Sequence, residues 1–158
     1  MNNVFLQDYK LTLGVDFFQK KYVFAQQKQQ YQLWYQFWDI AGQDYNTNLV
    51  HSFYANSSAC VIVCDVSVQS FQNGLQLWLN EVRAKVLSQQ RVPTVLVCNK
   101  MDLQDVRRLF DGKMQSILGK LGFDAVLPAS AMTGEGADEL LSVLSGLIVK
   151  YQGANGAV

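Results

Sequence analysis

The sequence predicts an α/β domain, built on a mostly parallel β-sheet that is flanked by helices. From Ala59 onward, short apolar runs alternate with amphipathic stretches, which is the pattern of parallel strands joined by right-handed helical crossovers. The apolar runs at 59–66 and 94–98 are nearly continuous, as is typical of parallel strands covered on both faces. A chain of 158 residues has the length of one domain and can bury a core of its own.

Composition narrows the classes of function. The formal net charge is zero, so no basic excess indicates a nucleic-acid or anionic membrane surface. The first residues show no signal peptide, and no apolar run is long enough to span a bilayer. We therefore expect a cytoplasmic protein, attached to any membrane or cytoskeletal assembly through protein partners. Its three cysteines are expected to be buried, reduced thiols.

The amino-terminal part predicts a loop followed by a hairpin. Residues 1–12 show little periodicity. The runs 15–25 and 32–40 are rich in aromatic and β-branched residues, and the polar linker 26–30 suggests that they pair antiparallel. Residues 45–54 are weakly amphipathic and predict a short helix.

The remaining part predicts three strands and three helices in alternation. The expected strands are 59–66, 94–98 and 125–128. The expected helices are 71–87, 105–121 (stopped by Gly122) and 135–151. The domain would occupy residues 1–151, with a short flexible tail at 152–158.

Polar motifs follow three of the predicted strands. Trp38-Asp39-Ile40-Ala41-Gly42-Gln43-Asp44 begins at the end of 32–40, where a carboxylate can reach a metal through water and a glycine can admit a phosphate. Asn99-Lys100-Met101-Asp102 follows 94–98, and Ala129-Ser130-Ala131-Met132-Thr133-Gly134 follows 125–128. Ligands of parallel sheets bind beyond these carboxyl ends. Alone, Ser130 reads as a turn residue; in register with the other two motifs it reads as part of a site.

These segments resemble the small GTPases of the Ras superfamily, and the Rab branch in particular. The matching motifs are W-D-x-A-G-Q at residues 38–43, N-K-x-D at 99–102 and S-A at 130–131, in the family's order. Phe5, Tyr9 and Thr12 resemble the Rab switch I segment in spacing and type. Met132 stands where the family usually has a lysine. The resemblance implies a Ras-type G domain of the P-loop NTPase-like class, which binds GTP or GDP with Mg²⁺.

The resemblance also implies a role for each residue at the phosphates. Thr12 would bind Mg²⁺ and sense the γ-phosphate, and Asp39 would hold Mg²⁺ through water. Gly42 would contact the γ-phosphate, and Gln43 would be the catalytic residue that orients the attacking water.

A second group of residues would read the base. Asp102 would accept the N1–H and the exocyclic amine of guanine, a donor pair that adenine lacks, while Asn99 braces the base loop. Phe5 would pack on the base, and the stem of Lys100 would lie over the ring. The N–H of Ala131, in the loop of Ser130, would donate to guanine O6.

Three aromatic residues match the effector surface of Rab proteins: Phe17, Trp38 and Phe53. The alternative is that they are ordinary core or hairpin aromatics. The resemblance therefore implies protein partners at switches I and II, and no nucleic acid.

One family motif is not found in this sequence. No segment fits the phosphate loop G-x-x-x-x-G-K-S/T, and the family's first strand, which lies between the strands ending at Asp39 and Asp65, has no counterpart; the Walker A loop is thus missing. No cysteine for a lipid anchor is visible near the end. Three explanations stay open: a longer native chain, a degenerate fold whose sheet gap is filled by a partner, or strands closed into a smaller sheet.

Two functions follow from these observations. The first is a GTPase switch that hydrolyses GTP and is read by effectors. The second is a non-catalytic interaction module in a larger assembly, with a protein partner at the sheet gap. The sequence does not distinguish vesicle trafficking from a cytoskeletal role.

Overall fold

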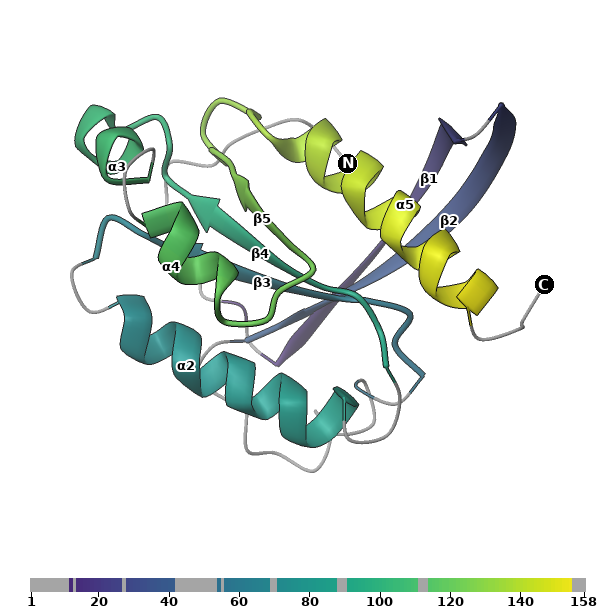
Figure 1. Cartoon of the computed structure of the whole chain (residues 1–158), viewed down its shortest axis with the longest axis horizontal. Coiled ribbons are helices and arrows are strands. Elements are labelled where there is room, and N and C mark those ends of the chain that lie inside the picture. Colours follow the sequence, from purple (N-terminus) through teal and green to yellow (C-terminus); the bar gives the residue numbers. More distant parts are fainter. Residues whose placement is uncertain are drawn as a thin grey trace. The chain divides into compact units, whose positions relative to one another are not determined.

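A computed structural model describes residues 12, 14–26, 28–41, 54, 56–68, 71–87, 91–110 and 114–154. The chain forms two compact units, residues 1–57 and residues 58–158. The first contains a two-stranded sheet, and the second contains a three-stranded sheet with helices (Figure 1). The helix predicted over 45–54 lies outside the described residues, apart from Tyr54.

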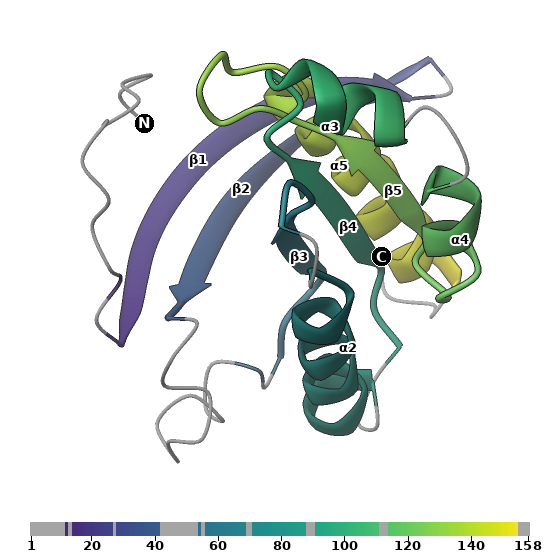
Figure 2. The same ribbon diagram turned by 90° about the vertical axis from the view of Figure 1, so that its left-hand side faces the viewer.

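The first unit is a long antiparallel hairpin. Strand β1 (Val15–Gln26) pairs with β2 (Gln29–Ile40), in a register that runs from Val15 opposite Ile40 to Gln26 opposite Gln29. Figure 2 shows the two as long, curved neighbouring strands. The predicted hairpin is confirmed, but the predicted five-residue linker is wrong. Lys28 takes a left-handed φ of 66°, so the chain turns tightly and the glutamine-rich ends extend the ladder.

The strands β3, β4 and β5 form the sheet of the second unit. They span Cys60–Asp65, Thr94–Asn99 and Ala125–Pro128, lie in the order β3-β4-β5, and pair parallel throughout. Helices connect them and flank the sheet, with α2 (Phe71–Val82) and α5 (Ala137–Ala154) on opposite sides of the strands in Figure 1. The predicted α/β fold with a parallel sheet flanked by helices is confirmed.

Burial differs between the two apolar strands. In β4, Thr94 to Cys98 are all buried, as predicted for a strand covered on both faces. In β3, however, Val63 is 61% exposed, so the same prediction is wrong there. Among the described strands β3 pairs only with β4, and β2 only with β1.

Two of the predicted helices are divided. The helix expected over 71–87 is α2, followed by a π-helical turn at Arg83–Leu87. The helix expected over 105–121 consists of α3 (Gln104–Leu109) and α4 (Gln115–Gly119). Asp111 and Gly112, both poor helix formers, stand between them in the sequence. Gly122 follows at a φ of 84°, which agrees with its predicted role as a stop.

The last helix is displaced relative to its expected bounds. α5 begins at Ala137, two residues later than predicted, because Gly134 and Gly136 both have a φ of 82°, outside the helical region. It continues to Ala154, three residues past the expected end at Tyr151. Asp138 and Glu139 lie in its first turn, where negative charge stabilises a helix.

The core of the second unit lies on both sides of β4. Its largest fully buried apolar side chains come from α2, the π-helical turn, β4, the loop that follows β4, and α4: Leu79, Val86, Val95, Leu96, Met101 and Leu118. All three cysteines are free thiols. No helix in the described part of the chain has both the length and the apolar character that crossing a bilayer requires.

Candidate functional site

The loop after β4 is the first half of the candidate guanine site. Asn99 is the last residue of the strand, and Lys100 adopts a left-handed φ of 75°, which turns the chain sharply away from the sheet. Met101 is 1% exposed, while Asp102 is half-buried. The buried methionine thus anchors a loop whose polar residues, Asn99 and Asp102, remain accessible at the carboxyl end of the sheet.

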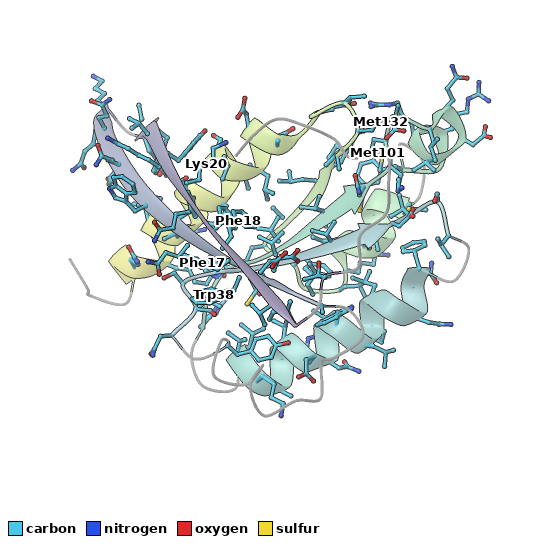
Figure 3. The ribbon with its side chains drawn as sticks, turned by 180° about the vertical axis from the view of Figure 1, so that it is seen from behind. Phe17, Phe18, Lys20, Trp38, Met101 and Met132 are labelled. Carbon is cyan, nitrogen blue, oxygen red and sulfur yellow. The ribbon has the colours of Figure 1, made fainter. Side chains whose placement is uncertain are left out.

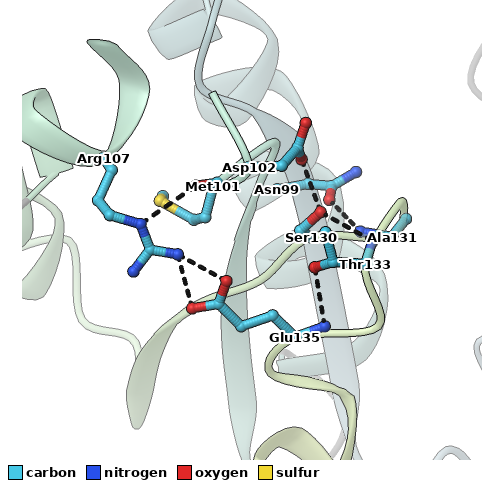
Figure 4. Close-up of polar contacts among 8 residues, drawn as sticks. All are labelled: Asn99, Met101, Asp102, Arg107, Ser130, Ala131, Thr133 and Glu135. Carbon is cyan, nitrogen blue, oxygen red and sulfur yellow. Dashed lines mark hydrogen bonds and ion pairs between the residues drawn. The ribbon is translucent and has the colours of Figure 1, made fainter. Parts of the chain in front are cut away.

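The loop after β5 is the second half, and hydrogen bonds join it to the first (Figure 4). The Ser130 hydroxyl donates to Asp102 Oδ1 at 2.6 Å, and the Ala131 N–H donates to Asn99 Oδ1 at 2.9 Å. The backbone N–H of Met101 also donates to the carbonyl of Ala129 at 3.0 Å. The structure therefore brings together four of the residues that the sequence assigns to guanine: Asn99, Asp102, Ser130 and Ala131.

Ser130 is the most enclosed of these residues. It is 1% exposed, and its oxygen accepts the N–H of Thr133 at 3.2 Å while donating to Asp102. A hydroxyl that both donates and accepts has a fixed orientation. Its hydrogen bond to Oδ1 therefore restricts the rotation of the Asp102 carboxylate.

One contact differs from the expected arrangement. The sequence assigns the Ala131 N–H to guanine O6, but in this structure that N–H is bonded to Asn99 Oδ1. An incoming carbonyl oxygen would have to share or replace the Asn99 contact. Met132, at the position of the family's usual lysine, is 61% exposed.

Sequence reasoning missed three residues around these loops. Arg107 Nη2 lies 2.6 Å from both carboxylate oxygens of Glu135, and its Nε donates to the Met101 carbonyl at 3.2 Å. The Thr133 hydroxyl accepts the N–H of Glu135 at 3.3 Å. The one sequence signal for this turn is the pair of glycines that flank Glu135, because both positive φ values fall there.

The candidate metal and phosphate residues belong to the first unit. Thr12 Oγ1 lies 3.4 Å from Asp39 Oδ2, so the two predicted Mg²⁺ residues are neighbours. Hydroxyl and carboxylate oxygens are hard ligands that suit Mg²⁺, which retains several of its waters when bound. Phe5, Gly42 and Gln43 lie outside the described residues.

Two of the three predicted effector residues are described. The rings of Phe17 and Trp38 lie opposite each other on β1 and β2, with centroids 4.7 Å apart and planes tilted by 43° (Figure 3). Their side chains are 48% and 45% exposed, so neither is a core residue of the hairpin. Phe53 lies outside the described residues.

Comparison with known proteins gives the class. The family described as "Ras of Complex, Roc, domain of DAPkinase" matches residues 1–102. Ras-related protein RABG3f of Arabidopsis thaliana is 31% identical over 150 residues, which is 92% of this chain and 70% of that protein. The chain belongs to the Rab-like small GTPases of the Ras superfamily.

Two further relatives show the same resemblance over a smaller share of their own length. Ras-related protein Rab-33 of Caenorhabditis elegans is 31% identical over 89% of this chain and 45% of that protein. Ypt/Rab-type GTPase YPT7 of Saccharomyces cerevisiae is 32% identical over 76% of this chain and 57% of that protein. The chain thus spans about half the length of these two curated relatives.

Proposed function

We propose that this chain binds GTP and GDP through Asn99, Asp102, Ser130 and Ala131, and that the bound nucleotide controls its interaction with protein partners. The observation that carries the proposal is the Ser130–Asp102 hydrogen bond of 2.6 Å, which orients a half-buried carboxylate at the carboxyl ends of β4 and β5. An oriented carboxylate can accept the N1–H and the exocyclic amine of guanine together. Adenine offers no such pair and would leave the carboxylate unsatisfied.

The Asn99–Ala131 contact supports a role for Asn99 in preparing the site for the base. In this structure, Asn99 Oδ1 accepts the amide N–H of Ala131 and keeps it satisfied. When guanine enters, O6 takes over this donor, and Asn99 continues to brace the loop. Lys100, exposed and turned at a φ of 75°, supplies its stem as a cover for the ring.

Equilibrium binding tests the base preference. The whole chain, with Mg²⁺ present, is titrated into fluorescent GDP, and unlabelled GDP, GTP and ADP then compete for the site. We expect GDP and GTP to displace the probe at least about a hundredfold better than ADP, the discrimination of a site whose buried acceptor loses its donors. Equal displacement by ADP and GDP would sink the proposal.

Thr12 and Asp39 are the proposed Mg²⁺ residues. Bound Mg²⁺ would supply positive charge to the phosphates. The 3.4 Å separation of Thr12 Oγ1 and Asp39 Oδ2 supports a shared site, with Asp39 acting through water. Asp39→Asn is expected to reduce the dependence of GTP affinity on Mg²⁺, measured with and without a chelator, whereas Asp105→Asn on α3, whose side chain is 95% exposed, is expected to leave it unchanged.

We further propose that the chain hydrolyses GTP and that Gln43 orients the attacking water. The support is the resemblance of residues 38–43 to the corresponding GTPase segment. Gln43→Leu keeps the size of the side chain and removes its polar end. Phosphate release in single turnover should slow by at least about tenfold, because the water loses its positioning group. An unchanged rate would exclude Gln43 from this role.

Protein partners are proposed at two surfaces. The exposed Phe17–Trp38 pair supports an effector surface on the hairpin, because contiguous exposed aromatics often mark a binding site. The exposed Val63 supports the β3 edge of the three-stranded sheet as the second surface, because an edge strand can accept a further strand. This second surface is the basis of the alternative function as an interaction module.

A further inference from the structure

Arg107 of α3 connects three segments that are separate in the sequence. Its Nε donates to the carbonyl of Met101 in the loop after β4, at 3.2 Å. Its Nη2 lies 2.6 Å from Oε1 and 2.6 Å from Oε2 of Glu135, in the loop after β5. A single guanidinium therefore ties the helix to both loops of the proposed guanine site.

Glu135 extends this connection through its own backbone. Its carbonyl accepts the N–H of Ser130 at 3.0 Å, and its N–H donates to the Thr133 hydroxyl at 3.3 Å. Ser130 in turn donates its hydroxyl to Asp102, the residue that follows Met101. Glu135 thus binds Arg107 through its carboxylate and Ser130 through its backbone carbonyl.

These contacts close a ring. It runs from Asp102 through Met101 to Arg107, then to Glu135, to Ser130, and back to Asp102. Figure 4 shows the side-chain contacts of this ring. In a closed ring the two loops cannot separate or rotate against each other unless at least one contact breaks. Only Asp102 and Ser130 of this ring belong to the proposed guanine-reading residues.

We propose that Arg107 and Glu135 are positioning residues, which set the place of the Asp102 carboxylate and thereby the selectivity of the site for guanine. The inference rests on the proposed nucleotide binding. Neither residue is expected to contact the base. Their effect passes through Met101 on one side and through Ser130 on the other.

Solvent exposure separates this role from simple stabilisation. The side chains of Arg107 and Glu135 are 44% and 45% exposed, so water and salt screen the attraction between them. Such a pair adds little to overall stability. It still restricts geometry, because each partner also makes a hydrogen bond to a loop, and small displacements of a binding group have large effects on recognition.

The chain offers a matched control in the next residue. Arg108 lies on the same helix, and its side chain is 79% exposed and 3.9 Å from that of Asp105. That ion pair lies within α3 and joins no loop of the site. Arg107→Gln and Arg108→Gln thus remove the same charge from the same helix, but only the first opens the ring.

The test measures affinity for GDP and for inosine diphosphate, whose base lacks the exocyclic amine of guanine. Arg107→Gln should weaken GDP binding by about fivefold, the upper end for an exposed pair, because it also opens the ring of contacts between the two loops. It should also shrink the preference for GDP over inosine diphosphate, because a displaced Asp102 no longer meets the amine. Arg108→Gln should change neither quantity by more than about twofold.

Two conservative variants separate the contacts of the ring. Arg107→Lys retains a positive charge for Glu135 but cannot reproduce the Nε hydrogen bond to Met101, so it should recover part of the lost selectivity. Glu135→Gln removes the charge and should resemble Arg107→Gln. Thermal unfolding midpoints of all variants should remain close to that of the unchanged chain, and a variant that unfolds is replaced by the other member of the pair.

Amide hydrogen exchange provides a readout that needs no nucleotide. In the unchanged chain the N–H groups of Met101, Ser130 and Ala131 are bonded, and Arg107→Gln should accelerate their exchange while Arg108→Gln should not. If the unchanged chain binds no guanine nucleotide, the proposed function is wrong. The comparison of amide exchange between the two glutamine variants then tests by itself whether Arg107 holds the two loops together. Equal exchange and equal selectivity in the two glutamine variants would overturn the inference.

Discussion

In the proposed guanine site, one hydrogen bond, between Ser130 and Asp102, orients the carboxylate that would accept the base. Asp102 is half-buried and Ser130 is 1% exposed, and their 2.6 Å contact spans two loops that are 28 residues apart in sequence. A carboxylate without such a partner rotates freely and accepts donors in many directions. With it, the acceptor direction is defined, and the chemistry of the base decides what binds.

Asp102→Asn tests this at the level of a single atom. The amide replaces one acceptor oxygen with a donor, which suits a base that carries a carbonyl where guanine carries its exocyclic amine. We expect GDP affinity to fall by about a hundredfold and xanthosine diphosphate to become the preferred ligand. Competition titrations with both nucleotides measure the change. Retained preference for GDP would contradict the assigned role of Asp102.

Gly136 carries a second constraint at this scale. It has a φ of 82°, and a Cβ placed on it would lie 2.4 Å from the carbonyl oxygen of Pro128. Gly136→Ala should therefore lower the free energy of unfolding by about 2 kcal/mol or more, from left-handed strain together with the clash. Chemical denaturation measures this. Gly153→Ala, in α5 with nothing within 4 Å, should be neutral or slightly stabilising.

At the scale of the element, the two faces of a helix or strand have different roles: one packs in the core and the other faces solvent. In α2 the buried residues Leu75, Leu79 and Val82 follow helical spacing, and Val86 continues their face into the π-helical turn. On the hairpin, Phe18 and Phe37 stack with centroids 4.8 Å apart, whereas Phe17 belongs to the exposed face. Neighbouring aromatics of one strand thus serve different purposes because side chains alternate across a strand.

Two leucines of α2 form a matched pair for measuring how much the buried face contributes to the free energy of unfolding. Leu79 is 2% exposed and Leu77 is 65% exposed, on the same helix. Leu79→Ala should lower the free energy of unfolding by about 2–5 kcal/mol, because it removes buried methyl groups and leaves a cavity. Leu77→Ala should change it by less than about 0.5 kcal/mol. Similar values for both would show that α2 does not bury the expected face.

At the scale of the whole molecule, the two compact units differ in how much core each has to stabilise it when it folds alone. Residues 58–158 contain a central buried strand, helices and a contiguous core, whereas the hairpin of the first unit is two-stranded. An isolated two-stranded sheet is marginal in water, since it has too little apolar surface to bury.

We therefore expect residues 58–158 to fold when expressed alone, and the segment 12–41 to show no cooperative unfolding. Circular dichroism during heating distinguishes the two outcomes, with a sigmoidal transition for the first and a gradual change for the second. A larger fragment without a transition would mean that its core depends on residues before 58. The complete chain is the control for the position of the transition.

The elements of the fold were largely predictable because periodicity is a local property. The parallel strands, the hairpin and α5 are where apolar spacing predicts them, within a few residues. The tight turn at Lys28 was not predictable, since lysine carries no turn preference. The exposure of Val63 was missed for another reason, namely that it depends on which neighbours cover each face of the strand.

The amino-acid sequence was sufficient for the family, and its motif spacing and strand order place Asn99, Asp102 and Ser130, the residues of the proposed guanine site, at one edge of a parallel sheet. It contained no indication that Arg107 and Glu135 meet, since the two are 28 residues apart and neither belongs to a motif. Their contact arises from the turn at Gly134 and Gly136 and from the position of α3. Contacts between residues far apart in the sequence depend on how the chain packs, and local pattern does not encode them.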